Sequence, residues 1–335
     1  MLPTNIFSGY WNYGHCQGIA VDAAREYMYY SFTTALVKTD MQGNLVGSCT
    51  GLLGHLGCIA YCEADGRVYG SLEYKNDAIG RGILDHIGHA GGVQDAFYIA
   101  IFDVSKIDRV GMDACRDGVM TSVYLKEVVD DYLAEVDLHG AMVKHRHGCS
   151  GIDGATFGPM PGSADGKKYL FVCYGVYSDV DRDDNDDQVM LCYDTTDWAR
   201  YERPLSQESM HVCGPEKPDR KFFVRTGNTT YGVQNLEYDP HCGGFLMAVY
   251  PGRKPQWANE PMFIVDASVP PAGDRLTLMQ GPSGLGWEYP HGSTGLIALG
   301  GGEYYVSHHG RDENGHFTNV RLCRWNGKTP IESVD

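Results

Sequence analysis

Apolar residues in this chain recur in short runs, separated by turns rich in glycine, proline and aspartate. Residues 15–32, 55–74, 151–177, 232–250 and 292–309 share one plan. Each has a short apolar strand, a turn, and a longer strand of apolar and aromatic residues. Short strands with turn residues at such intervals are typical of all-β folds. The sequence therefore predicts five copies of an antiparallel strand pair.

Further strands follow most of these pairs. Third strands are expected at 97–104, 188–194, 261–266 and 320–325, and fourth strands at 45–49, 119–125 and 275–279. Four antiparallel strands in a repeated unit are the pattern of a β-propeller blade. The arrangement resembles five-bladed propellers as a class, and this resemblance implies a single domain over residues 1–335.

The spacing of the repeats favours five blades. Aligning the first strands gives one column of residues, separated by 40, 96, 81 and 60 positions: Gln17, Gly57, Asp153, Gln234 and Thr294. A blade needs about 40–50 residues. Seven blades would need a hidden strand pair in each of the two long intervals, and none is visible there.

One segment has the periodicity of a helix. The apolar residues between 126 and 136 fall on one helical face. They are Val128, Val129, Tyr132, Leu133 and Val136. We expect a single short helix at 126–136, packed on the side of the propeller.

Composition and charge limit the kinds of binding partner and the cellular compartment that we expect for this protein. Lys and Arg number 27 against 43 Asp and Glu, a net charge of −16, so a nucleic acid backbone would be repelled. No apolar run approaches the 18 or so residues of a membrane helix, and the first residues lack the pattern of a signal peptide. The 11 cysteines are scattered, several within strands (Cys58, Cys173, Cys192), which predicts reduced thiols in a cytoplasmic protein.

The histidines gather on one expected face. In a propeller, loops leading into first strands and loops joining second to third strands open on the same side. Ten of the 13 histidines lie in these loops, among them His86, His308, His309 and His316. Functional residues concentrate on loops held by a rigid scaffold, so we expect the site on this face.

Four histidines from different blades precede first strands and are candidate ligands for Zn, Mn or Fe: His15, His55, His147 and His291. The alternative is that they hydrogen-bond strand ends or bind substrate directly. The acidic loop 179–187 is a second metal candidate, for Ca²⁺, although a solvated acidic loop explains it better, because the glycine and the distant Glu of an EF-hand are missing.

Cations, amides and aromatic rings on this face suggest a substrate. Basic groups gathered around one pocket suit an anion, and aromatic planes stack on sugar rings. The candidate binding residues are Gln17, Asp153, Gln234, Arg81, Arg253, Trp257, His308, His309 and Arg311.

These residues favour an enzyme acting on an acidic, uronate-containing saccharide, as a lyase or a glycosidase. His55 or His147 would move the proton, Arg146 would neutralise the carboxylate, and Tyr174 or Tyr177 would relay the proton. The set is loosely similar to propeller-fold polysaccharide lyases, which use His, Tyr and Arg. Two alternatives stay open: a metal-dependent hydrolase, isomerase or oxygenase, and a propeller that binds a small molecule or oligosaccharide without catalysis.

Overall fold

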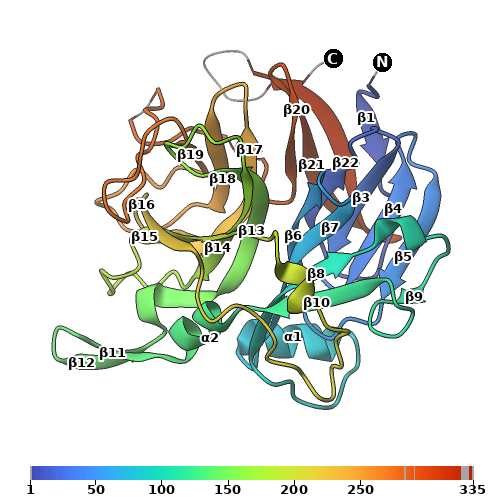
Figure 1. The fold of residues 1–335 in the computed structure, drawn as a ribbon, viewed down its shortest axis with the longest axis horizontal. Coiled ribbons are helices and arrows are strands. Elements are labelled where there is room, and N and C mark those ends of the chain that lie inside the picture. Colours follow the sequence, from blue (N-terminus) through green and yellow to red (C-terminus); the bar gives the residue numbers. More distant parts are fainter. Residues whose placement is uncertain (1, 283, 290, 326–331, 334–335) are drawn as a thin grey trace.

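The chain folds as an all-β, five-bladed propeller, as predicted. The computed structural model describes residues 2–282, 284–289, 291–325 and 332–333 (Figure 1). The innermost strands of the blades contact one another in cyclic order around a central axis. They are β2 (Cys16–Val21), β6 (His55–Cys62), β13 (Cys149–Pro159), β17 (Thr230–Asp239) and β20 (Leu296–Gly300).

The first three blades each continue outward as an antiparallel sheet. Blade one adds β3 (Tyr27–Phe32), β4 (Ala35–Asp40) and β5 (Leu45–Thr50), and β9 (Met112–Asp113) runs parallel to β5. Blade two adds β7 (Arg67–Tyr74), β8 (Ala96–Phe102) and β10 (Met120–Tyr124). Blade three adds β14 (Lys168–Val176), β15 (Asp187–Tyr193) and β16 (Arg220–Arg225), the last of which the sequence pattern did not reveal.

The fifth blade joins the two ends of the chain. After β20 it contains β21 (Glu303–Asp312) and β22 (Gly315–Arg324), and its outer strand is the N-terminal β1 (Asn5–Phe7). The short β23 (Glu332–Ser333) also pairs with β22. Ile6 of β1 is buried in the core between the fifth and first blades. This closure was not predicted, because three residues carry too little pattern to mark a strand.

Blade four has β17, β18 (Gly244–Tyr250) and β19 (Met262–Asp266), and the fourth strand predicted at 275–279 is absent from it. That segment divides its hydrogen bonds between two blades. Phe223 of β16 donates to the carbonyl of Asp274, whereas Asp266 of β19 donates to that of Thr277. Neither blade therefore receives a continuous strand.

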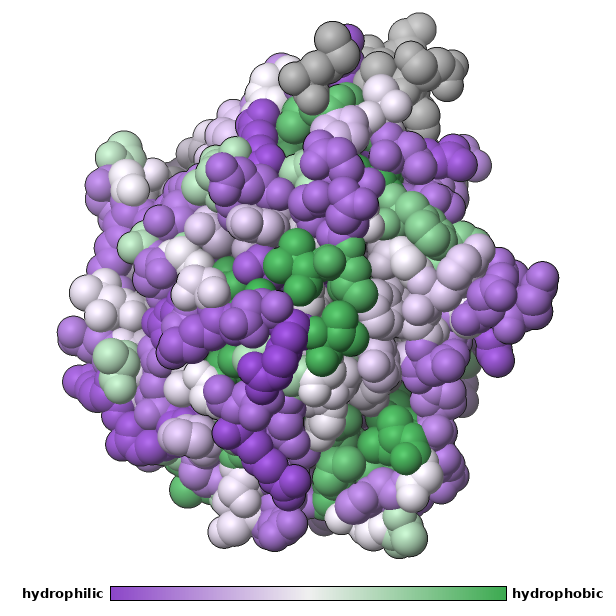
Figure 2. Space-filling model, turned by 90° about the vertical axis from the view of Figure 1, so that its right-hand side faces the viewer, coloured by the Kyte–Doolittle hydropathy of each residue, from purple (hydrophilic) through white to green (hydrophobic). Residues whose placement is uncertain are grey.

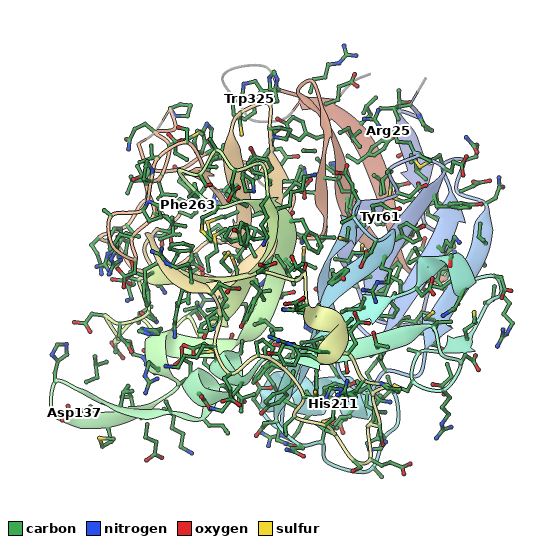
Figure 3. The ribbon with its side chains drawn as sticks, in the orientation of Figure 1. Arg25, Tyr61, Asp137, His211, Phe263 and Trp325 are labelled. Atoms are coloured by element: carbon green, nitrogen blue, oxygen red, sulfur yellow. The ribbon has the colours of Figure 1, made fainter. Side chains whose placement is uncertain are left out.

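The predicted helix is present but shorter. Helix α2 (Lys126–Leu133) ends three residues early, because Val136 pairs with Val143 in the hairpin of β11 (Glu135–Leu138) and β12 (Ala141–Lys144). The hairpin projects from the body at the lower left of Figure 1, and its Asp137 is labelled in Figure 3.

The expectation of a single helix was wrong, because the loop after β7 contains a second one, α1 (Ala78–His86). Asp77 caps it by accepting a hydrogen bond from the Gly80 N–H at 2.8 Å. Two glycines, Gly80 and Gly82, weaken the helical signal of this segment. The apolar spacing of Ile79 and Ile83 after an Asp cap was the signal that could have revealed it.

The surface seen from the right of Figure 1 is largely hydrophilic, with a hydrophobic patch near its middle (Figure 2).

Cys58, Cys173 and Cys192 are buried free thiols, as expected from their place in apolar strands. Among the described residues, no helix is both long and apolar enough to cross a membrane.

Candidate functional site

β-Bulges lie at the aligned positions of four innermost strands. The strand register shifts at Gln17 in β2, at Gly57 in β6, at Asp153 in β13 and at Gln234 in β17. A bulge places an extra residue in one strand and re-aims its side chain. Gln17, Asp153 and Gln234 all line one cavity at the inner strands. The repeat column in the sequence thus contributes three polar side chains to one cavity.

Gly57, which has no side chain, leaves space for the carboxyl group of Asp153. A Cβ atom at this position would lie 2.1 Å from Asp153 Oδ1. Such a distance is impossible for a real side chain, so Asp153 occupies the space that a residue in β6 would otherwise fill.

The cavity has two connected chambers. The first, of about 370 Å³, contains Asp153, Glu73 and Lys75, and we call it the acidic chamber. The second, of about 330 Å³, contains Arg311 and His316, and we call it the histidine chamber. Both chambers are lined by His15, Gln17, His55 and Ile79. Ile79 belongs to α1, so this helix covers the point where the chambers meet.

A buried ion pair shapes the acidic chamber. Lys75 Nζ lies 2.6 Å from Glu73 Oε1 and donates to the carbonyl of Ser150 at 2.8 Å. Glu73 Oε2 accepts from the backbone N–H of Ile152 at 3.1 Å. Burial alone would raise the pKa of Glu73, but the charges of Lys75 and His55 hold it below its usual value. Glu73 therefore stays ionised.

Asp153 lies in the same chamber and behaves differently. Its Oδ1 is buried and has no hydrogen-bond partner among the described residues. Burial raises the pKa of Asp153 to about 7, although the nearby His55 lowers it in part. The pKa of Glu73 is thus lowered and that of Asp153 raised within one chamber. Enzymes use such a difference to keep one carboxyl group protonated, as an acid, at neutral pH.

His55 lies next to both carboxyl groups. Its Nδ1 is 3.4 Å from Glu73 Oε1, close enough for attraction but not aligned as a hydrogen bond. Burial lowers the pKa of His55, but contact with Glu73 and the charge of Asp153 raise it more, so the net shift is upward. His55 and Asp153 are thus two titratable groups of one chamber whose pKa values are both raised.

The structure directs Arg146, Tyr174 and Tyr177 away from the chambers. Arg146 Nη1 donates to Asp131 Oδ1 at 2.8 Å, and the buried Tyr174 hydroxyl donates to Asp131 Oδ2 at 2.9 Å. Tyr177 donates to Asp77, the cap of α1, at 2.8 Å. Asp131 lies on α2, so these residues fasten the two helices to the propeller.

The four histidines predicted as metal ligands do not lie together. His15 and His55 line both chambers. The His147 ring packs against Phe223 at 5.0 Å between centroids, and the His291 ring against His308 at 4.2 Å. No group of three or more His, Cys, Asp or Glu side chains suited to a metal occurs in the described part of the chain. Metal binding stays a prediction.

The acidic loop is fastened by its own basic residues. Arg182 donates to both carboxylate oxygens of Asp184, at 2.8 and 2.7 Å. The buried Lys254 contacts Asn185 Oδ1 at 2.7 Å and Asp186. A lysine ammonium thus occupies part of the loop proposed for Ca²⁺, whose binding there also stays a prediction.

The remaining predicted binding residues are dispersed. Arg311 lines the histidine chamber, and His309 contacts its wall through His15 and His316. Arg253 is exposed, and Arg81 is exposed on α1. The Trp257 ring packs beneath the Arg225 guanidinium at 5.0 Å.

Sequence reasoning missed Glu73 and Lys75. They lie two positions apart where β7 ends, so both side chains point to the same side of the strand. The signal was a Glu-x-Lys pair closing a strongly apolar strand.

No family model matches the chain, and no curated protein matches it. Among solved structures, the Dos1 propeller is 11% identical with a TM-score of 0.39 over 88% of this chain, which spans about half (53%) of its length. The soluble aldose sugar dehydrogenase of Escherichia coli, in the apo-form, is 12% identical (TM-score 0.39; 94% of this chain and 98% of that one). The β-propeller domain of Myceliophteria thermophila Cps50 (Swd1) is 9% identical (TM-score 0.34; 95% and 99%). Likeness at this level concerns the fold alone and carries no argument about the site.

Proposed function

We propose that the protein is an enzyme acting by proton transfer on a small acidic saccharide, uronates included, bound at the propeller axis. The observation that carries this proposal is the pairing of Asp153 with His55. Asp153, with a buried carboxyl oxygen that has no partner among the described residues, lines the same chamber as the imidazole of His55, and both groups have raised pKa values, that of Asp153 to about 7. Titratable groups with shifted pKa values that share one cavity are typical of active sites.

The chambers suit a saccharide in size and chemistry. A volume of about 370 Å³ fits one or two sugar rings rather than a polymer chain in cross-section. The amides of Gln17 and Gln234 can both donate to and accept from sugar hydroxyls. The Tyr250 side chain adds an aromatic surface to the acidic chamber.

Each group has a role in bond cleavage. Protonated Asp153 gives its proton to the leaving oxygen as the bond to that oxygen breaks. Neutral His55 takes a proton, either from an attacking water in a glycosidase or from a ring carbon in a lyase. Ionised Glu73 then stabilises the imidazolium that forms, because it lies 3.4 Å from His55 Nδ1. The proton returns to Asp153 through solvent when the product leaves.

The test is turnover of a panel of short neutral, uronate-containing and esterified saccharides, followed by reducing-end and unsaturated-product assays. We expect Asp153→Asn and His55→Gln to lower kcat at least 100-fold, with substrate affinity changed less than threefold. A matched control is Glu237→Gln: burial raises the pKa of Glu237 to about 8, but this residue accepts from Thr156 and Ala298 and does not line either chamber. Full activity of Asp153→Asn in a well-folded variant would refute the proposal.

A further inference from the structure

The histidine chamber has the opposite electrostatic character to the rest of the molecule. The net charge of the chain is −16, yet no Asp or Glu is among the described residues that line this chamber. Its wall contains Arg311 and His15, His55, His86 and His316. Arg311 is exposed where it lines this chamber, and its side chain forms no ion pair with a described carboxylate, so its charge is available to a ligand that enters from solvent.

The donors come from separate directions. Gly14 and His15 precede β2, Thr33 and Thr34 form the turn between β3 and β4, and His86 ends α1. Arg311 and His316 come from the hairpin of β21 and β22 on the other side. A planar carboxylate presents two oxygens in one plane, whereas donors on several sides suit the three free oxygens of a tetrahedral ester group.

Hydrogen bonds orient one imidazole for this role. His309 Nδ1 accepts from the backbone N–H of Cys16 at 3.3 Å, so the ring proton of neutral His309 is on Nε2. That nitrogen lies 3.4 Å from His316 Nδ1 and donates to it. The proton of neutral His316 is then on Nε2, the nitrogen left to donate to a ligand.

Burial keeps these rings neutral. Burial, together with the nearby His55, His309 and His316, lowers the pKa of His15 to about 4. Burial and His316 likewise lower the pKa of His309 to about 4. Arg311 therefore supplies the permanent positive charge and the imidazoles supply N–H donors.

We propose that the histidine chamber is a subsite for a tetrahedral oxyanion, so that the saccharide substrate carries a phosphate or sulfate ester. This inference rests on the proposed function, because the ester in one chamber would hold the sugar ring in the other, beside Asp153 and His55. The two chambers share His15, Gln17, His55 and Ile79, so one molecule can occupy both.

Calorimetric titration of the full chain with sodium sulfate, sodium phosphate, a hexose 6-phosphate, a hexose 6-sulfate and glucuronate tests the subsite. We expect at least one hexose ester to bind about tenfold or more tightly than glucuronate, and the tighter of the two identifies the ester. Equal or tighter binding of glucuronate would overturn the inference in favour of a carboxylate.

Two arginine variants distinguish binding in the histidine chamber from unspecific binding to the protein surface. Arg311→Gln should weaken binding of the tighter hexose ester at least tenfold. The control is Arg116→Gln, because Arg116 is exposed after β9 at the edge of blade one and lines neither chamber; it should leave the affinity unchanged. Equal affinity of these two variants would overturn the subsite. Asp153→Asn should still bind the ester. If the wild-type protein binds the ester but turns over no esterified saccharide of the panel, the proposed function is refuted and the subsite stands.

Discussion

Asp153 shows how one residue depends on the local backbone and on neighbours at two other positions. The bulge in β13 turns its side chain to the axis, Gly57 leaves space for it, and Ser71 donates to its carbonyl at 2.7 Å. The sequence indicated Asp153 and Gln234 correctly as members of one column, because the repeat fixes their place in a blade. It did not indicate which arginine lines the cavity, because the sequence pattern placed both Arg146 and Arg311 in loops and only tertiary contacts distinguish them.

The stability of the protein should depend on pH through Asp153. Its folded pKa of about 7 lies above the value of 3.8 for an unperturbed Asp, so the folded state binds this proton more tightly. The stability that Asp153 contributes is complete below about pH 4 and is lost as pH rises through about 7. Asp153→Asn, which cannot ionise, should gain roughly 2–4 kcal/mol relative to the wild type between pH 4 and pH 7.5.

Urea titrations at both pH values measure this difference, with the exposed Asp108→Asn as control. If the free energies of unfolding of Asp153→Asn and wild type differ by the same amount at both pH values, Asp153 is not a buried neutral acid.

Among the secondary-structure elements, helix α1 was not predicted from the sequence, although it forms part of the wall of both chambers. Its Ile79 and His86 line the chambers, and His86 Nε2 lies 3.3 Å from the carbonyl of Asn12, before blade one. Nine residues with two glycines carry little intrinsic helicity. The helix exists because Asp77 caps it and because the propeller face receives its apolar side, which are contacts that periodicity alone does not report.

The two glycines of α1 should respond in opposite ways to alanine. A Cβ at Gly80 would lie 1.9 Å from the carbonyl oxygen of Lys75, whereas a Cβ at Gly82 meets nothing within 4 Å. Gly82→Ala should stabilise the helix locally by about 1 kcal/mol, and Gly80→Ala should disrupt its first turn.

Limited proteolysis measures the local opening of α1. Cleavage between residues 75 and 95 should slow about fivefold in Gly82→Ala and accelerate in Gly80→Ala. Equal cleavage rates in the two variants would show that α1 does not depend on this packing.

For the whole molecule, the number of blades was predictable and the closure was not. Spacing between first strands limits the number of blades, because each needs a minimum length of chain. Closure joins β1 to β22, more than 300 residues apart in sequence, and Leu322 N donates to Thr4 O at 3.0 Å. Pattern within a window cannot detect such a pairing.

Ile6 should be critical for this closure. Its side chain is 1% exposed between the fifth and first blades, so Ile6→Ala should lower the free energy of unfolding by about 2–5 kcal/mol. Leu45→Ala, at a strand residue that is 46% exposed, should change it by less than about 0.5 kcal/mol. Thermal or urea unfolding compares the two variants, and similar losses for both would mean that β1 is dispensable.

The pairing of β1 with β22 also sets an order for synthesis on the ribosome. Three of the first residues to emerge belong to a blade whose other strands are made last. At about 5–20 residues per second, β1 waits roughly 15–60 s for its partner. During that time blades one to four can stack as an open arc, with β2 and β17 each exposing a face that β20 later covers. The nascent chain is therefore most open to misassembly with another copy just before the final blade is complete.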